Sequence, residues 1–275
     1  FQYQFKLKRR IMRRIESGKV LSNHKLAKGM YRMDISLPDI SSEVQGPGQF
    51  ISLTVGEGWQ MPLRRPMSIA SVENESISII YKIFGEGTVW LKDRSSGEVI
   101  EAIGPLGNKF SLDKINGKEI ILVGGGVGVA PILYLHDQLS EDNRDHLLIV
   151  GSVTAAEQFL EHSPKAGIHL TTDDGSVGEK GTVMTMLEIL ADKVENPYII
   201  ACGPKPMLAA IYKFTTEKGL EGQFAVESYM ACGTGLCQGC VIETTKNFNK
   251  EHSYHQKYSL VCSDGPVYDI NAIHI

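Results

Sequence analysis

The stretch that decides the fold class reads Ile120-Ile121-Leu122-Val123-Gly124-Gly125-Gly126-Val127-Gly128-Val129-Ala130-Pro131. Four consecutive apolar residues favour a buried strand, and the glycines after them predict a tight loop. Pro131 suits the first turn of a helix that begins after this loop. A strand that ends in a glycine loop and opens a helix is typical of a phosphate site, because helix N–H groups face the anion. Tight packing would also require glycines, so the loop alone leaves both interpretations open.

The chain on both sides of this stretch alternates between apolar strands and helical segments. Strands are predicted at 119–123, 147–150 and 198–201, and helices at 130–139, 181–193 and 206–218. Continuous apolar strands that alternate with helices indicate a parallel sheet covered on both faces. We therefore predict an α/β nucleotide-binding domain over residues 114–222.

Other segments of this domain are predicted to border an NAD molecule. Asp173 and the run Cys202-Gly203-Pro204 follow apolar strands, which places them at the carboxyl edge of the sheet, where ligands bind. The loop 151–157 offers no Arg or Lys to a 2′-phosphate, and Glu157 is suited to a ribose hydroxyl, so NAD is favoured over NADP. Cys202 is a possible catalytic residue near the nicotinamide, or equally a small buried residue at a strand end. The predicted NAD site is completed by Gly124, Gly125, Gly126 and Gly128.

The region before the α/β domain consists of short predicted strands separated by Gly and Pro. The strands lie at 31–37, 49–54, 76–82 and 98–102, with turn signals at Gly46-Pro47-Gly48 and Gly104-Pro105-Leu106-Gly107. This spacing is typical of a small antiparallel barrel, which we predict over residues 15–113. Residues 1–14 are basic and weakly patterned, and we expect a solvated extension or a contact site for an acidic partner.

Composition and charge exclude several classes of protein. A net charge of −4 over 275 residues argues against a nucleic-acid binder, which usually carries a strongly basic face. No apolar run approaches the roughly 20 residues that a membrane-spanning helix needs. The basic residues near the start are not followed by the apolar core of a secretory signal. We therefore expect a cytoplasmic protein whose cysteines stay reduced and available as metal ligands.

Four of the five cysteines lie close together in the C-terminal region. The motif Cys232-Gly233-Thr234-Gly235-Leu236-Cys237-Gln238-Gly239-Cys240 is followed by Cys262. A C-x4-C-x2-C run with a distant fourth Cys is the plant-type [2Fe–2S] spacing. The intervening glycines let the loop wrap closely and aim N–H groups at the sulfurs. A structural zinc site is the rival interpretation, but it usually shows two C-x2-4-C pairs. We predict a small [2Fe–2S] domain over residues 223–275 with these four cysteines as ligands.

Two motifs of the barrel region are suited to phosphate binding. Arg65 and Ser68 lie three residues apart in a segment that Pro66 helps to hold extended, and a guanidinium makes forked contacts with phosphate. The run Gly85-Glu86-Gly87-Thr88 offers backbone N–H groups before a helical stretch. Taken alone, either motif is also compatible with a turn that carries a surface charge.

Together with the later motifs, these residues resemble the ferredoxin–NADP reductase superfamily from about residue 15 to the end. Within it, the chain is most similar to the electron-transfer subunits of class B dihydroorotate dehydrogenase. The matching runs are Leu63-Arg64-Arg65-Pro66-Met67-Ser68-Ile69, Gly104-Pro105-Leu106-Gly107-Asn108, Glu227-Ser228-Tyr229-Met230-Ala231-Cys232-Gly233 and Val261-Cys262-Ser263-Asp264-Gly265-Pro266-Val267. The order of barrel, nucleotide domain and cluster domain also matches.

The resemblance implies an FAD site in the barrel. Arg65 would hold the FAD pyrophosphate, and Ser68 would lie near the redox-active nitrogen of the flavin. The implied FAD residues are Arg65, Pro66, Met67, Ser68, Ile80, Tyr81, Lys82, Gly87 and Thr88. Met67 stands where many members have Tyr, so another side chain has to stack on the flavin, and Tyr81 is the candidate. The stretch between Cys240 and Cys262 is longer than the family's usual loop, and its His252 and His255 are expected to be solvated.

The resemblance also implies a partner and a reaction. The partner would be an FMN-containing catalytic subunit that oxidises dihydroorotate to orotate, in a heterotetramer of two copies of each chain. Electrons would pass through the [2Fe–2S] cluster and FAD to NAD⁺. One alternative is the small subunit of an NADH-dependent ferredoxin–NADP reductase or a sulfide dehydrogenase, but these typically have Asp where this chain has Cys232. Another is a non-catalytic metal-binding module on a reductase scaffold.

Overall fold

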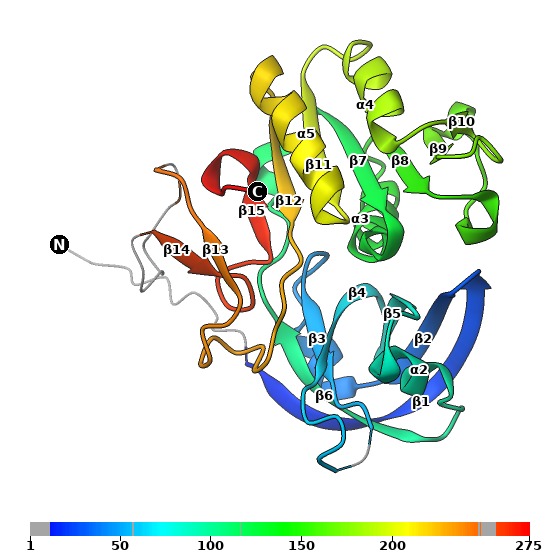
Figure 1. Ribbon diagram of the computed structural model, residues 1–275, viewed down its shortest axis with the longest axis vertical. Helices are drawn as coiled ribbons and strands as arrows, with labels where there is room; N and C mark the ends of the chain where they lie inside the picture. The colour runs from blue at the N-terminus through cyan, green and yellow to red at the C-terminus, as the bar shows by residue number, and fades with distance from the viewer. Residues whose placement is uncertain (1–11, 57, 116, 247, 249–256) are drawn as a thin grey trace.

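The computed structural model describes residues 12–56, 58–115, 117–246, 248 and 257–275, and Figure 1 shows its parts. Within these residues the first part is a closed barrel with the strand order β1-β2-β5-β4-β3-β6. Its strands are β1 Arg14–Ala27, β2 Met30–Ser36, β3 Phe50–Leu53, β4 Arg65–Glu73, β5 Ser76–Lys82 and β6 Val99–Leu106. The helix α1 (Pro38–Glu43) lies between β2 and β3, and α2 (Glu86–Lys92) lies between β5 and β6. The predicted antiparallel barrel is confirmed.

The alternation of side chains along the strands explains how the barrel forms a core. Ile35 of β2, Ile51 of β3 and Ile69 of β4 are fully buried in one apolar cluster. The strand β1 was not predicted from the sequence, because most of its side chains are exposed or half-buried and its apolar pattern is weak. It nevertheless pairs with both β2 and β6 and so removes the open edges of the sheet.

The second part is an α/β unit built on a seven-stranded sheet with the order β10-β9-β8-β7-β11-β12-β15. Its strands are β7 Glu119–Gly125, β8 His146–Ser152, β9 Ile168–Thr172, β10 Glu179–Lys180, β11 Pro197–Cys202, β12 Glu221–Ala225 and β15 Val267–Asp269. Its helices are α3 Val129–Glu141, α4 Val183–Ala191 and α5 Lys205–Lys218. Single-turn 3-10 helices lie at Leu112–Ile115, Gly126–Gly128, Ala155–Glu157, Pro164–Ala166 and Ile270–Ala272.

Helices cover both faces of this sheet, as the continuous apolar strands predicted. On β7, Ile121 belongs to the same buried cluster as Leu187 of α4. Its neighbour Leu122 belongs to a second cluster with Leu135 of α3. Because successive side chains of a strand point to opposite faces, both faces of β7 need an apolar cover. The predicted parallel α/β architecture is confirmed for β7 to β12.

The C-terminal part is joined to the α/β unit by a strand pairing. A two-stranded sheet is formed by β13 (Val241–Glu243) and β14 (Tyr258–Leu260). The strand β15 pairs antiparallel with β12, with Phe224 opposite Tyr268. The predicted boundary at residue 222 therefore lies inside β12, and β15 belongs to the larger sheet. The division into three domains remains a prediction.

The predictions for the basic extension and for the histidines of the long loop cannot be compared with the structure in full. Residues 1–11 of the basic extension lie outside the described residues, and so do His252 and His255 of the long loop. Among the helices that are described, none is long and apolar enough to span a membrane.

Candidate functional site

The glycine loop after β7 combines a turn with close packing. Gly126 has a φ of +55°, and a Cβ added to it would meet no atom within 4 Å. Gly128 differs, because a Cβ on it would lie 2.5 Å from the backbone nitrogen of Gly203. Thus Gly126 serves a turn beside open space, whereas Gly128 lets the loops after β7 and β11 approach each other closely. Close packing is thus shown for Gly128, and the phosphate-site interpretation of the loop stays a prediction.

A cavity of about 420 Å³ lies at the carboxyl edge of the sheet beside this loop. It is lined by the predicted NAD residues Gly125, Gly126, Asp173 and Pro204, and also by Lys82, Gly151, Glu157, Thr171, Thr182 and Met207. Gly124, Gly128, Cys202 and Gly203 are not part of its lining. The volume and the phosphate loop at one end suit the adenosine and pyrophosphate portions of a dinucleotide.

Cys202 is a buried residue at the end of β11. It is 3% exposed, and burial together with the nearby Glu227 carboxylate raises the pKa of its thiol. A thiol in such surroundings is a poor nucleophile at neutral pH. This agrees with the interpretation of Cys202 as a small buried residue, and its proximity to a bound nicotinamide stays a prediction.

Lys82 and Glu157 connect the barrel to the α/β unit at the rim of the same cavity. Lys82 Nζ lies 3.1 Å from Glu157 Oε2. Close by, the backbone N–H of Lys28 donates to the carbonyl of Ala156 at 2.8 Å. The sequence assigned Lys82 to FAD and Glu157 to NAD, and the structure brings the two together. A lysine is therefore present near the loop 151–157, but it comes from the barrel and is paired with a carboxylate.

The residues predicted to hold the FAD pyrophosphate meet at one end of the barrel. Arg65 begins β4, and its Nε lies 2.8 Å from the position that a Cβ on Gly87 would take at the start of α2. Its Nη1 donates to the carbonyl of Leu63 at 2.6 Å. The first N–H groups of a helix lack intrahelical acceptors, so the start of α2 and the nearby Arg65 guanidinium are together suited to an anion, and the FAD pyrophosphate at this place stays a prediction.

Thr88 has a structural role beside this arrangement. Its Oγ1 accepts hydrogen bonds from the backbone N–H groups of Phe84 at 2.8 Å and Gly85 at 3.1 Å. It also donates to the carbonyl of Gly85 at 2.9 Å. These bonds fix the turn before α2, so the structure shows Thr88 as a residue that holds the backbone of this turn, and its contact with FAD stays a prediction.

The two faces of β4 separate the remaining FAD residues of this strand. Met67 lies opposite Ile51 of β3 and packs in the barrel core. Ser68 is half-buried, lies opposite Phe50 and faces the outside of the barrel, and so does Pro66 two residues earlier. The outer face thus presents Pro66 and Ser68 together, as a flavin site on this strand requires.

The structure contradicts the hypothesis that Tyr81 stacks on the flavin. Tyr81 is 1% exposed, and its hydroxyl donates to Asn23 Oδ1 at 2.9 Å inside the barrel. Ile80 is buried as well, in the cluster that includes Val129 of α3. The sequence could not show that Ile80 and Tyr81 are both buried, because the cover over the two faces of β5 comes from parts of the chain that are distant in sequence. Among the described residues, the fully exposed aromatic rings near these motifs are Trp59, Phe84 and Tyr229.

The four cysteines of the C-terminal motif are linked by hydrogen bonds to sulfur. Cys240 and Cys262 are buried, with sulfurs 3.1 Å apart, and the N–H of Cys262 donates to Cys240 Sγ at 3.4 Å. Cys232 Sγ accepts from the N–H groups of Thr234 and Cys237, both at 3.4 Å. In the described part of the chain, no three Cys, His, Asp or Glu side chains are grouped closely enough to form a complete metal site. The structure thus brings Cys240 and Cys262 together and links Cys237 to Cys232 through its backbone N–H, and the assignment of all four to one cluster stays a prediction.

The surroundings of two of these sulfurs, those of Cys232 and Cys240, favour thiolates. Burial raises the pKa of Cys232, but the N–H groups of Cys237 and Thr234 outweigh it and hold the pKa at about 6. The hydrogen bond from the Cys262 thiol, together with the Cys262 N–H, lowers the pKa of Cys240 to about 6. The pKa of Cys262, the donor of that bond, is raised. N–H groups aimed at sulfur are what an iron–sulfur cluster needs around its ligands, so this donor set fits a cluster.

The cysteine loop lies against the barrel strand that neighbours β4. A Cβ on Gly233 would lie 3.4 Å from Leu106 Cδ1 and 3.8 Å from Ser52 Oγ. Ser52 is the register partner of Pro66 on β4. The next residue of the loop is also bonded to the barrel end of the chain, because Arg13 Nη1 donates to the carbonyl of Thr234 at 3.2 Å. The predicted cluster site and the predicted flavin strand are therefore adjacent.

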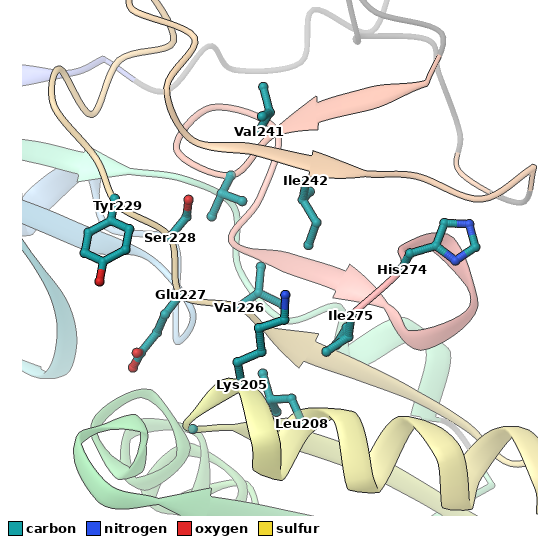
Figure 2. A pocket seen from close by; sticks show the side chains of 12 residues that line it. Lys205, Leu208, Val226, Glu227, Ser228, Tyr229, Val241, Ile242, His274 and Ile275 are labelled. Carbon is teal, nitrogen blue, oxygen red and sulfur yellow. The ribbon is translucent and has the colours of Figure 1, made fainter.

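A second cavity, of about 540 Å³, lies between α5, the segment after β12 and the β13–β14 sheet (Figure 2). Lys205 and Leu208 of α5 form one wall, and Val241 and Ile242 of β13 form the opposite wall. Glu227 also lines it, and burial raises the pKa of this carboxyl. The sequence placed Glu227 in a matching motif without giving it a role.

Comparisons with known proteins add the following findings. The family model described as iron–sulfur cluster binding domain of dihydroorotate dehydrogenase B matches residues 227–274. A protein of Fusobacterium nucleatum described as dihydroorotate dehydrogenase B (NAD(+)), electron transfer subunit, is 34% identical over 271 residues, with 95% of this chain and 99% of that protein covered. A protein of Lysinibacillus sphaericus with the same description is 36% identical over 262 residues, with coverages of 94% and 97%. The structure of an NADH-dependent reduced ferredoxin–NADP oxidoreductase superposes with a TM-score of 0.80 at 23% identity, over 94% of this chain and 89% of that one.

Proposed function

Because the chain belongs to the family of dihydroorotate dehydrogenase B electron transfer subunits, we propose that it links dihydroorotate oxidation on a partner subunit to NAD⁺. Its cofactors are FAD and a [2Fe–2S] cluster, with NAD(H) as co-substrate. A cluster supplies one-electron chemistry, NAD supplies hydride chemistry, and flavin is competent in both. The observation that carries the proposal is the close approach of the cysteine loop at Gly233 to Ser52 of β3, the strand that pairs with the flavin strand β4 at Pro66.

The chain's own residues bind and position these groups. We assign Cys232, Cys237, Cys240 and Cys262 to the cluster. Arg65 and the start of α2 bind the FAD pyrophosphate, and Ser68 on the outer face of β4 borders the flavin ring. Gly125 and Gly126 bind the NAD pyrophosphate at the edge of the sheet. In this arrangement the barrel, the loop and the sheet hold the three groups side by side, and little acid–base chemistry is required of the side chains.

The partner we propose is the FMN-containing catalytic subunit, in a heterotetramer with two copies of each chain. Cys237 is exposed, and its neighbour Leu236 is 86% exposed, so the cysteine loop presents an apolar edge to the outside. An exposed apolar edge beside a redox site suits a protein partner that exchanges electrons. We place the complex in the cytoplasm, where reducing conditions keep cysteines available for metal.

The proposed function is tested by co-expressing the chain with a class B catalytic subunit and measuring NAD⁺ reduction driven by dihydroorotate. We expect an FMN protein to co-purify with the chain and the complex to reduce NAD⁺. The catalytic subunit alone, assayed with an artificial electron acceptor, controls for its own activity. If that control is active and the complex forms but leaves NAD⁺ unreduced, the proposed function is wrong.

NADH is expected to reduce the bound flavin faster than NADPH, by at least about tenfold in kcat/KM. The reason is the Lys82–Glu157 ion pair at the cavity rim, because the carboxylate neutralises a cation that a 2′-phosphate would otherwise meet. Substituting Glu157→Gln removes the carboxylate that pairs with Lys82. We expect this to lower the ratio of kcat/KM for NADH to kcat/KM for NADPH by roughly three- to tenfold, mostly through a lower KM for NADPH. Stopped-flow reduction with both nucleotides measures this. A wild-type preference for NADPH would contradict the assignment.

A further inference from the structure

The phenyl ring of Phe84 lies almost completely in the open just before α2. Phe84 is 97% exposed, whereas β5, the strand that it follows, buries Ile79, Ile80 and Tyr81. The backbone of Phe84 is nevertheless held in place, because its N–H donates to Thr88 Oγ1 at 2.8 Å. A large apolar ring that the described residues leave uncovered gains nothing from burial within the chain. A ligand that covers the ring supplies this missing contact.

The residues that are suited to an anion lie within three positions of this ring. Gly85 is extended, with a φ of −155°, and a Cβ on it would meet no atom within 4 Å outside its chain neighbours. The space next to Phe84 is therefore open. A Cβ on Gly87 would lie 2.8 Å from Arg65 Nε and 3.2 Å from Val55 Cγ2. The turn that carries Phe84 thus also brings Gly87 against the Arg65 guanidinium.

The direction of the strands places Phe84 beyond Arg65 when the barrel is followed from Ser68. Ser68 and Arg65 lie three residues apart on β4, which corresponds to about 10 Å. The strand β5 runs antiparallel to β4, with Ile79 opposite Ile69. The direction from Ser68 to Arg65 is therefore the direction along β5 that leads to Phe84.

This direction decides which half of FAD reaches the exposed ring. The step rests on the proposed function, which puts the flavin ring beside Ser68 and the pyrophosphate at Arg65. An FAD molecule laid along β4 in this way brings its adenosine half to the turn before α2. Phe84 is favoured as the contact over other exposed rings, because its N–H is bonded within the same turn that meets Arg65.

We propose that the ring of Phe84 stacks on the adenine of FAD and thereby selects FAD over FMN. FMN has the same flavin ring and one phosphate, but it lacks the adenine. A base presents a flat π-face to an aromatic side chain, and such stacking needs no hydrogen-bond partner. In this arrangement Arg65 holds the pyrophosphate and Phe84 holds the base, at a distance from the reacting flavin ring.

The test titrates FAD and FMN into the full chain after removal of its flavin and follows flavin fluorescence. We expect Phe84→Ala to bind FAD about tenfold more weakly and FMN within about twofold of the wild-type value. Phe84→Tyr keeps the ring and should keep both affinities within about twofold. The thermal midpoint of flavin-free Phe84→Ala should equal that of wild type, because the side chain is exposed. Trp59→Ala removes a ring that is 92% exposed between β3 and β4, and as the control it should leave the FAD affinity unchanged.

Three results would overturn the proposal. One is an unchanged affinity of Phe84→Ala for FAD, whether or not Trp59→Ala loses affinity. Another is an equal loss of affinity for FAD and FMN in Phe84→Ala, which would place the ring against the flavin half. The third is a lowered thermal midpoint of flavin-free Phe84→Ala, which would make the ring structural. If the wild-type protein binds neither FAD nor FMN, the proposed function fails, and that result is distinct from the other three.

Discussion

Cys237→Ser is expected to abolish the [2Fe–2S] signal in electron paramagnetic resonance and with it the transfer of electrons to or from the partner. Cys237 lies in the exposed part of the cysteine loop, and its N–H donates to Cys232 Sγ at 3.4 Å. A serine hydroxyl is harder than a thiolate and stays protonated at neutral pH, so it replaces a cluster ligand poorly. The barrel and the α/β unit are unaffected, so NADH should still reduce the FAD of this variant.

Cys202→Ser is the matched control, because Cys202 is the fifth cysteine and lies at the end of β11, outside the motif. It should keep the cluster signal at the wild-type level. A wild-type spectrum in Cys237→Ser, or loss of the signal in Cys202→Ser, would show that the ligands are wrongly assigned. A colourless, zinc-containing preparation of the wild-type protein would contradict the cluster itself.

Arg65→Met is expected to weaken FAD binding by roughly 10- to 150-fold, since a hydrogen bond to a charged group contributes about 1.5–3 kcal/mol. The guanidinium packs over Gly87 at the start of α2 and has no carboxylate partner among the described residues, so its charge remains available to a phosphate. Titration of the flavin-free protein with FAD, followed by flavin fluorescence, measures the dissociation constant.

Arg64→Met is the matched control at the neighbouring position. The Arg64 guanidinium pairs with the Glu101 carboxylate, and its Nη1 also donates to the Glu101 carbonyl at 3.3 Å. Loss of the Arg64 guanidinium should lower the thermal stability slightly and leave the FAD affinity within about twofold of the wild-type value. Equal losses of FAD affinity in both variants would mean that the barrel end is disturbed as a whole and that Arg65 has no special role.

The sequence predicted those features that depend on residues close together in the chain. The apolar run 120–123 and its glycines gave the strand, the loop and the helix, because each is stabilised by local geometry and by periodic burial. The spacing of Cys232, Cys237 and Cys240 indicated a cluster for the same reason, since one short loop must present several ligands. The barrel was evident from short strands and turns, although β1 escaped notice because its pattern is weak.

Tertiary structure decided which side chains face a ligand and which belong to the core. Tyr81 looked suitable for flavin stacking, but the closed barrel covers both faces of β5 and buries its ring. Lys82 and Glu157 are 75 residues apart and meet only because the barrel packs on the α/β unit. Likewise, Thr171 and Thr172 are neighbours in the chain and both are fully buried, but Thr172 Oγ1 donates to the carbonyl of Val177, whereas Thr171 Oγ1 has no hydrogen-bond partner among the described residues.

The sequence by itself therefore determined the order of the units, the phosphate loop and the cysteine motif, because short-range spacing specifies each of them. The arrangement of these parts was decided by long-range strand pairing and packing. Such pairing fixes the face to which each side chain points, and a shift of one residue along a strand would reverse that face. For this reason the adjacency of the cysteine loop and the flavin strand, and the partnerless hydroxyl of Thr171, became visible only in the folded chain.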